Sequence, residues 1–244
     1  RLVREHEVSP EGVDYIVHAT TVATNAIIEG KVAATGFITT EGFRDMLEIA
    51  RQIRPELYNL QFEKPKPLVP RHRCYGVVER LDARGEVLVP LDEEGLRQAA
   101  SELKQAGVES LAVCFLHAYA NPVHERRAGQ VLAEVFPEAM VSLSSQVAPE
   151  FREYLRASTT VINGCIRPVV ARYLQKIEER LQVAGFAAEL LVMQSGGGVY
   201  TAAAAQEQPV YMVESGPAAG VIAAAHLGQA LGYDKVISFD MGGT

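Results

Sequence analysis

Apolar residues recur at two different spacings along this chain of 244 residues. Short runs rich in β-branched residues, such as VDYIVHA at residues 13–19, predict buried strands. Between these runs, Phe43, Met46 and Leu47 lie three and four positions apart, which is the spacing of one apolar face of a helix. Strands separated by helices in this way favour parallel pairing through right-handed crossovers. The sequence therefore predicts an α/β fold.

Capping residues and prolines set the limits of several expected elements. Asp92 is suited to cap a helix that Gly107 ends. Pro149 begins a long helical region, in which Pro168 is expected to separate two helices. The segments CYGVVERL and EVLVPL flank DARG and predict a β-hairpin. Other strands are expected at residues 32–39, 108–117, 139–144, 188–193, 209–213 and 236–239.

Composition and charge exclude some classes of function. A net charge of -7 argues against a protein that wraps nucleic acid or lies on an anionic membrane. The three cysteines are too far apart for a metal knuckle and are typical of reduced thiols in a cytoplasmic protein. Residues 215–233 carry no formal charge, but they are dominated by Ala and Gly. We therefore expect a closely packed helix there and not a membrane span.

The last residues of the sequence, VISFDMGGT, form a candidate phosphate loop. An apolar strand would deliver Asp240 to the carboxyl edge of a sheet, where ligands bind in α/β folds. Gly242 and Gly243 lack Cβ atoms, so their N–H groups can approach a phosphate, and Thr244 adds a hydroxyl. Asp240 has the oxygen ligands that Mg²⁺ prefers. The alternative interpretation is a tight turn at the end of a strand.

A second candidate site lies where the strand at residues 13–19 meets a helix. Thr20, Thr21 and Asn25 cluster there, and they offer hydroxyl and N–H groups to an anion or a carbonyl of a substrate. Ordinary capping of the helix by a threonine explains the same residues equally well. The sequence leaves both interpretations open.

A third candidate is the loop MQSGGG, which follows an apolar strand. Gln194, Ser195 and Gly196 stand at the start of its glycine run and would line a ligand cleft at the end of the strand. A mobile turn is the alternative interpretation. We expect these three residues to contact the substrate if the loop is functional.

Context around the last loop suggests a known fold. A helix in ESGPAAGVIAAAHLG, a short connection and an apolar strand precede DMGGT. This order resembles the second phosphate motif of the ATPase fold shared by actin, sugar kinases and heat-shock chaperones. The resemblance implies two ribonuclease-H-like halves with ATP between them, of which this chain holds a part.

Several longer segments are similar to a single family. HATTVATNAIIEG, LHAYANPVHE, LLVMQSGGG and ESGPAAGVIAAA resemble the hydantoinase A/oxoprolinase family, and the similarity runs in order through nearly the whole chain. The family includes ATP-dependent N-methylhydantoinase, 5-oxoprolinase and subunits of ketone carboxylases. The resemblance implies an α/β region over residues 1–205, with a hairpin subregion near 54–92, and the start of a second ATPase half over 206–244.

The resemblance also implies a function. We expect a fragment of an ATP-dependent cyclic-amide hydrolase that phosphorylates its substrate and works with a second large subunit of hydantoinase B type. Asp240 is the expected catalytic residue, which organises Mg²⁺ or the attacking oxygen. The first phosphate loop is expected before Arg1 and the adenosine-binding segment after Thr244, so the fragment alone is expected to be inactive. The alternatives are a ketone carboxylase subunit and a nucleotide-switched ATPase without metabolic chemistry.

Overall fold

The computed structural model describes residues 9–53, 56 and 58–241. The chain divides into two compact units. We call Ala33–Pro168 the central unit, and Arg1–Val32 together with Val169–Thr244 the terminal unit. Helices and strands alternate along both, which confirms the predicted mixed α/β character.

The central unit is built on a four-stranded sheet with the order β3-β2-β6-β7. All three pairings in this sheet are parallel, so the carboxyl ends of the four strands share one edge. The apolar runs of the sequence explain the arrangement, since every residue of β2 and β6 is buried. The strands are Thr35–Thr40 (β2), Cys74–Val77 (β3), Ser110–Cys114 (β6) and Met140–Leu143 (β7).

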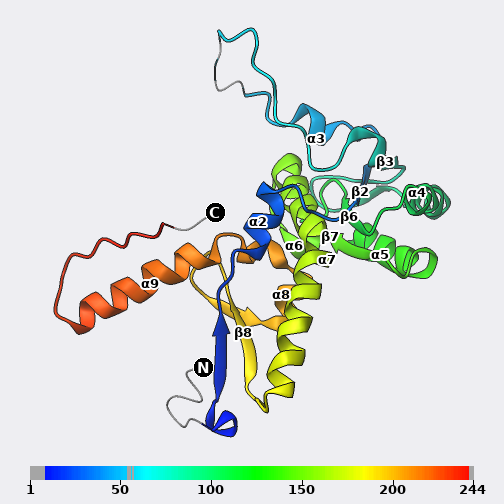
Figure 1. Ribbon diagram of the computed structural model, residues 1–244. Coiled ribbons are helices and arrows are strands. Elements are labelled where there is room, and N and C mark those ends of the chain that lie inside the picture. Colours follow the sequence, from blue (N-terminus) through cyan, green and yellow to red (C-terminus); the bar gives the residue numbers. More distant parts are fainter. Residues whose placement is uncertain (1–8, 54–55, 57, 242–244) are drawn as a thin grey trace. The chain divides into compact units, whose positions relative to one another are not determined.

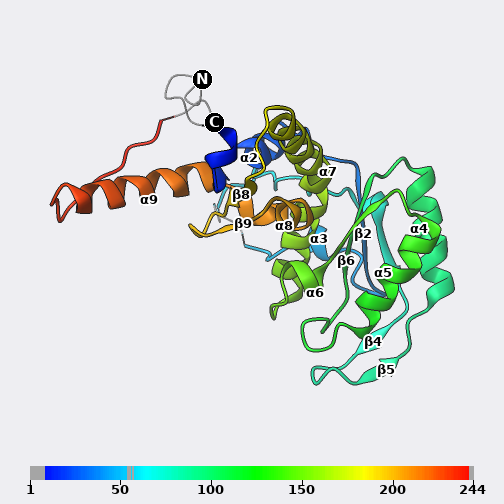
Figure 2. The same cartoon turned by 90° about the horizontal axis from the view of Figure 1, so that it is seen from below.

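Helices cover both faces of this sheet. Helices α4 (Glu93–Gln105) and α5 (Val123–Val135) lie together on one side of β2 and β6 (Figure 2). The other side receives the long helix α7 (Glu153–Val183), where Gly164 lies against the sheet. The apolar core on the α4 and α5 side includes Ile38, Leu96, Leu103, Leu111, Phe115 and Leu132, all fully buried. Each such side chain contributes about 1.5–3 kcal/mol to folding.

The predicted hairpin is confirmed in its inner part. Strands β4 (Arg80–Leu81) and β5 (Val87–Val89) pair antiparallel around the DARG turn. The residues just before it differ from the prediction, because β3 pairs in parallel with β2 in the main sheet instead of extending the hairpin. The remaining short elements of this unit are α3 (Met46–Ile49), η2 (Arg71–Arg73) and α6 (Ser144–Val147).

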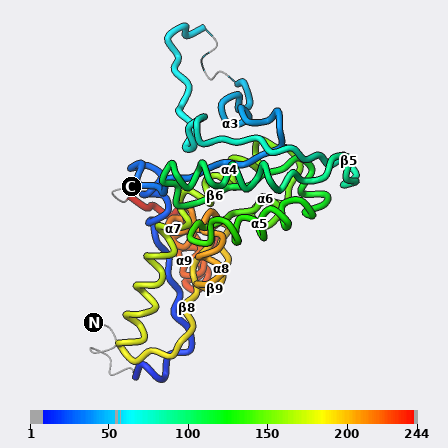
Figure 3. Tube along the Cα trace, turned by 90° about the vertical axis from the view of Figure 1, so that its right-hand side faces the viewer, coloured from blue at the N-terminus to red at the C-terminus, as the bar shows by residue number. Residues whose placement is uncertain are grey.

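The terminal unit contains a three-stranded sheet with the order β1-β8-β9. Strand β1 (Tyr15–His18) pairs in parallel with β8 (Glu189–Met193), which pairs antiparallel with β9 (Val199–Thr201). The C-terminal part of α7 runs alongside β1 and β8 (Figures 1 and 3). The other elements here are η1 (Pro10–Gly12), α2 (Val22–Ile28), α8 (Ala202–Glu207), η3 (Pro209–Met212) and α9 (Ser215–Ala230).

The predicted break at Pro168 is wrong, because α7 continues through it as one helix of 31 residues. Proline removes only one hydrogen bond from a helix, and the flanking Cys165, Ile166 and Val170 are fully buried. Packing of these side chains outweighs the local cost. Pro168 is nevertheless the last residue of the central unit, so the proline marks the boundary between the compact units.

Two predicted strands are also wrong. Residues 209–212 form the 3₁₀ helix η3 with Met212 buried, and the strand that pairs antiparallel with β8 is Val199–Thr201 instead. A short apolar run does not distinguish a strand from a helical turn. Residues 236–239 form no strand, and Ile237 is 97% exposed and Phe239 84% exposed. A strand requires a hydrogen-bonded neighbour, and within the described residues no strand pairs with this segment.

Within the described residues, no helix is both long enough and apolar enough to cross a membrane. The charge-free segment forms α9, as predicted, but most of its side chains are exposed instead of closely packed. The predicted boundary between residues 205 and 206 stays a prediction.

Candidate functional site

Two of the predicted ligand loops begin at the same edge of the terminal unit's sheet. In the parallel pairing of β1 with β8, His18 is the partner of Val192. The loop that holds Thr20 and Thr21 therefore starts beside the loop that holds Gln194. Carboxyl ends of parallel strands are the usual location of ligands in α/β folds. This edge is the candidate site.

A hydrogen-bonded group connects the first loop to α7. The Tyr173 hydroxyl lies 2.9 Å from Nε2 of His18 and accepts a hydrogen bond of 3.3 Å from the Thr20 hydroxyl. The His18 and Tyr173 rings lie 5.8 Å apart, centroid to centroid. Burial lowers the pKa of His18, since desolvation disfavours the imidazolium. The neutral imidazole is therefore the favoured form at pH 7.

The first turn of α2 holds an unpaired polar atom. The Asn25 amide donates to the Thr21 hydroxyl at 3.3 Å. Its carbonyl oxygen, Oδ1, is buried and has no hydrogen-bond partner among the described residues. Such atoms are rare in folded proteins because an unmade buried hydrogen bond costs about 1–3 kcal/mol. An acceptor left open here is the kind of group that a ligand completes.

The capping interpretation of these threonines is only partly confirmed. Thr21 stands at the N-cap of α2, but its side chain makes no capping hydrogen bond. The Thr20 hydroxyl accepts from the backbone N–H of Val22 at 3.2 Å instead. Thr20 thus closes the turn before α2, and the side chains of Thr21 and Asn25 do not take part in capping.

The start of α9 closes one side of the loop after β1. The Ser215 hydroxyl donates to the Thr20 carbonyl at 3.2 Å, and the Glu214 N–H donates to the Thr24 hydroxyl at 3.1 Å. Glu214 adopts a positive φ of 63°, which is uncommon for a residue with a side chain. These contacts bring the segment ESGP, which the sequence singled out only as a helix start, to the candidate site.

The MQSGGG loop is a hairpin turn between β8 and β9. The N–H and the hydroxyl of Ser195 both donate to the Tyr211 carbonyl, at 2.8 and 3.1 Å. Gly197 has a φ of 87°, which favours glycine, and a Cβ there would lie 2.7 Å from Cδ1 of Ile222 in α9. Gln194 is half-buried, whereas Ser195 and Gly196 are exposed. The loop is therefore a turn fixed against η3 and α9, with its tip open to solvent.

Of the four residues predicted for the phosphate loop, Asp240 is the one that the structure describes. Asp240 is exposed and belongs to a segment without helix or strand. Gly242, Gly243 and Thr244 lie outside the described residues. The described residues contain no group of three or more His, Cys, Asp or Glu that could hold a metal ion. The roles of these four residues stay predictions.

Tyr173 is the residue of this site that the sequence did not predict. It lies 155 residues from His18 along the chain, in the middle of a long helix. Its position follows only from the packing of α7 beside β1 (Figure 3). A signal existed, since Tyr173 lies between the buried Ala171 and Leu174 and its hydroxyl would then need a partner.

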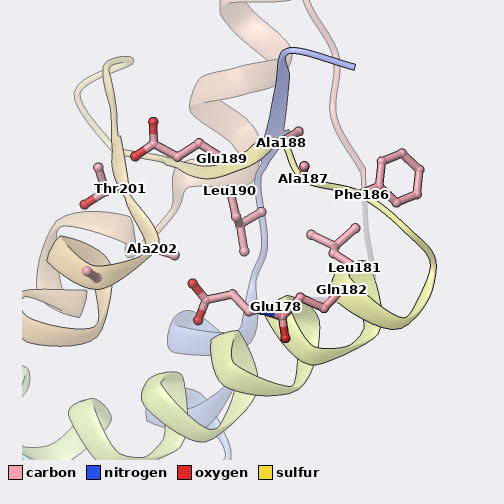
Figure 4. A pocket seen from close by; sticks show the side chains of 11 residues that line it. Glu178, Leu181, Gln182, Phe186, Ala187, Ala188, Glu189, Leu190, Thr201 and Ala202 are labelled. Atoms are coloured by element: carbon pink, nitrogen blue, oxygen red, sulfur yellow. The ribbon is translucent and has the colours of Figure 1, made fainter. Parts of the chain in front are cut away.

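A separate cavity of about 540 Å³ lies at the amino end of β8 (Figure 4). Glu178 and Gln182 of α7 line it together with Glu189 and Leu190 of β8 and Thr201. Since the candidate site is at the carboxyl end of the same strand, the two are distinct.

Comparison with known proteins identifies the family. The model of the hydantoinase/oxoprolinase N-terminal region matches residues 1–136, and that of hydantoinase/oxoprolinase matches residues 156–244. The chain belongs to the hydantoinase/oxoprolinase family. This membership confirms the resemblance found in the sequence.

Individual relatives support the same family assignment. An uncharacterised protein of Methanocaldococcus jannaschii is 44% identical over 238 residues, which cover 95% of this chain and 35% of that protein. The alpha subunit of caprolactamase from Pseudomonas jessenii is 34% identical and covers 95% of this chain and 34% of its own length. The chain therefore spans about one third of the curated relatives it matches.

Solved structures share the fold. The crystal structure of the ATP-dependent caprolactamase from Pseudomonas jessenii matches 100% of this chain and 36% of that one, with a TM-score of 0.88 and 31% identity. A nucleotide-free structure of acetone carboxylase, an ATP-dependent enzyme, matches 95% of this chain and 34% of that one, with a TM-score of 0.84 and 30% identity.

Proposed function

We propose that this chain is part of an ATP-dependent hydrolase that opens cyclic amides. The observation that carries the proposal is the match of the whole chain to the ATP-dependent caprolactamase. Caprolactam is a cyclic amide, as are hydantoins and 5-oxoproline. The overall reaction converts cyclic amide, ATP and water into the ring-opened amino acid, ADP and phosphate.

We assign binding of the substrate to the candidate site of the terminal unit. Thr20, Thr21 and Asn25 bring hydroxyl and amide groups to the carboxyl end of β1. Gln194 and Ser195 do so at the end of β8, where Gly196 would leave room for the substrate. The open Oδ1 of Asn25 supports a ligand there. These residues would hold and orient the amide, so that attack occurs in a fixed geometry.

ATP and Mg²⁺ are part of the proposal. ATP supplies the phosphoryl group that makes the amide carbonyl reactive. Asp240 fits the metal because an exposed carboxylate together with phosphate oxygens is a usual set of Mg²⁺ ligands. The predicted phosphate contacts of Gly242, Gly243 and Thr244 complete this proposal, within an actin-like fold whose second half starts near residue 206.

The proposal extends to a partner and a compartment. The caprolactamase relative is named as a subunit, which supports a second large subunit of hydantoinase B type here. The three cysteines are free thiols, which supports a reducing cytoplasmic environment.

The test uses the full-length protein with its partner subunit. ADP release and ring-opened product are measured with 5-oxoproline, hydantoin and caprolactam in turn. We expect one of them to give product and ADP in equal amounts, and Asp240→Asn to abolish both. ATP turnover that leaves every cyclic amide unchanged would refute the proposal and favour a nucleotide switch.

A ketone carboxylase is the second candidate, because the acetone carboxylase structure also matches. The same assay with acetone and bicarbonate decides between the two. A carboxylated product, formed with no ring opening of any amide, would favour this candidate.

A further inference from the structure

The central unit has a groove of its own beside α3. A cavity of about 490 Å³ is lined mainly by residues of the segments 49–53 and 62–67, in the region that is cyan in Figure 1. A second cavity of about 220 Å³ adjoins it, and the two share Leu47, Pro67 and Tyr154. Every lining residue belongs to the central unit. We call the two cavities together the α3 groove.

The charged residues in the lining of the larger cavity are all cations. They are Arg51, Lys64 and Lys66, in a chain whose net charge is -7. Arg51 and Lys66 are exposed and form no ion pair with a described residue. Nζ of Lys64 lies 3.8 Å from a carboxylate oxygen of Glu48, the longest separation that counts as an ion pair. This part of the groove therefore favours an anionic ligand.

The smaller cavity is apolar and carries two hydroxyl groups. Leu47 and Val161 in its lining are buried and Ile162 is half-buried, and the recorded lining includes no charged side chain. Tyr154 and Ser158 of α7 bring hydroxyls that form no hydrogen bond with a described residue. A mostly apolar cavity with a few convergent polar groups is the usual form of a binding site.

Large apolar side chains beside the groove are exposed. Ile53 in the lining is 65% exposed, and Tyr58 and Leu60, on the segment that joins the two walls, are 92% and 91% exposed. Single exposed apolar residues are ordinary, whereas several next to a groove mark an interaction surface. Aromatic residues and arginine are enriched at the centre of protein interfaces. The composition therefore fits a protein ligand better than a small molecule.

The connectivity of the chain bears on which protein supplies that ligand. Both ends of the chain belong to the terminal unit, and the central unit connects to it at residues 33 and 168. Further polypeptide at either end, as in the longer relatives, would attach to the terminal unit. A separate chain is therefore the simpler source of a segment that binds the central unit.

We propose that the α3 groove docks an acidic, apolar segment of the second large subunit. Carboxylates of that segment would pair with Arg51, Lys64 and Lys66, and an apolar side chain would enter the cavity at Tyr154. Complementary charges direct association and select the partner, while buried apolar side chains supply affinity. The inference rests on the proposed function for the existence of the partner, and it adds the surface at which the partner binds.

The first experiment measures the Kd between the full-length protein and the hydantoinase B-type subunit of the same organism, without ATP or amide. Arg51→Glu together with Lys66→Glu should weaken binding at least about tenfold and reduce its dependence on salt. The matched control is Arg84→Glu with Arg126→Glu, which reverses two exposed cations elsewhere in the same unit and should change the Kd less than about twofold. Equal weakening by the two pairs would overturn the inference.

The second experiment tests the apolar contact. Ile53→Asp should weaken binding at least about tenfold and leave the thermal midpoint unchanged, because the side chain is mostly exposed in the free protein. Leu88→Asp on β5, where the side chain is 61% exposed, is the control and should keep the wild-type Kd. Wild-type affinity in Ile53→Asp would overturn the inference.

Hydrogen exchange identifies what covers the groove. Backbone amides of residues 49–53 and 62–67 should exchange rapidly in the full-length protein alone and slowly after the subunit is added. Slow exchange in the protein alone would show that its own chain covers the groove. A dimer of the protein alone that Ile53→Asp dissociates would assign the groove to a second copy. Either result would overturn the inference.

The outcomes separate the two proposals, because binding is measured without turnover. A complex that depends on the α3 groove but opens no cyclic amide would refute the proposed function and leave the inference intact. Ring opening by a complex that tolerates all the groove substitutions would refute the inference alone. Failure of the two proteins to form any complex would refute the inference as well.

Discussion

In the central unit, the charged side chains at the carboxyl edge of the sheet are buried and paired, and the Ser145 hydroxyl is the buried polar atom recorded there without a partner. The polar side chains at the same kind of edge in the terminal unit are half-exposed, and among the described residues Asn25 Oδ1 has no partner. His124 lies 2.7 Å from the Glu79 carboxylate, which also accepts from the Thr40 hydroxyl. Glu125 accepts from the Ser144 hydroxyl at 2.6 Å and from the backbone N–H groups of residues 115 and 145. Glu79, His124 and Glu125 are all buried.

Both edges are carboxyl ends of parallel strands, but the difference in burial and pairing of their polar side chains indicates different roles. In the central unit, Arg156 donates to the Ser144 hydroxyl and to the carbonyls of Glu150 and Phe115, so the charged groups tie four chain segments together. A buried network with its charges satisfied holds one packing arrangement. In the terminal unit, the Asn25 carbonyl remains open. The first edge stabilises the fold, and we propose that the second receives a ligand.

The largest predicted effect is on stability in the central unit. Glu125→Ala leaves the Phe115 and Ser145 N–H groups and the Ser144 hydroxyl without their acceptor. We expect the free energy of unfolding, measured by urea titration, to fall by about 3–5 kcal/mol. The control is Glu134→Ala on the same helix, whose side chain is 53% exposed and pairs with Arg97, and it should cost less than about 1 kcal/mol. An equal loss of unfolding free energy in the two variants would contradict the stabilising role of the buried Glu125.

The second prediction concerns activity in the terminal unit. Asn25→Ala removes the open acceptor, so kcat/KM for ring opening should fall about tenfold, while the free energy of unfolding changes by less than about 1 kcal/mol. Ile28→Ala, an exposed position on the same helix, is the control and should leave both unchanged. A large loss of stability with Asn25→Ala would assign this residue to the fold and not to the site.

The smallest predicted effect is a pH dependence of stability from His18. Burial lowers its pKa in the folded protein, while the unfolded imidazole titrates near about 6.5. The unfolded state therefore binds more protons as the pH falls below about 6.5, and stability declines until the pH reaches the folded pKa. Above that range the contribution is constant.

The measurement is the thermal midpoint of the wild-type protein and of His18→Gln between pH 7.5 and 5.5. We expect the wild-type midpoint to fall more than that of the variant. Tyr173 is the titratable side chain recorded in contact with His18. Parallel pH curves would show that burial of His18 is not coupled to folding.

The sequence predicts the strand ends well because local patterns determine them. An apolar β-branched run followed by threonines, or by a glycine run, identifies the loops after β1 and β8. Their proximity follows once the strands are assigned as parallel. The predicted strand at residues 209–213 fails because five apolar residues have no distinct period.

Long-range contacts account for what the sequence could not predict. Tyr173 meets Thr20 across 153 positions, and helical periodicity gives the face on which a residue lies but not its neighbour. The continuity of α7 through Pro168 depends on buried side chains that a local proline rule ignores. The strand expected at residues 236–239 depends on a pairing partner that no local pattern supplies.

We propose that the edge formed by β1 and β8 holds the cyclic amide. The most direct test is a crystal structure of the full-length protein with its partner subunit, a non-hydrolysable ATP analogue and caprolactam or 5-oxoproline. We expect density for the ring beside Thr20 and Thr21. Density for the ring at any other place, with this edge unchanged, would contradict it.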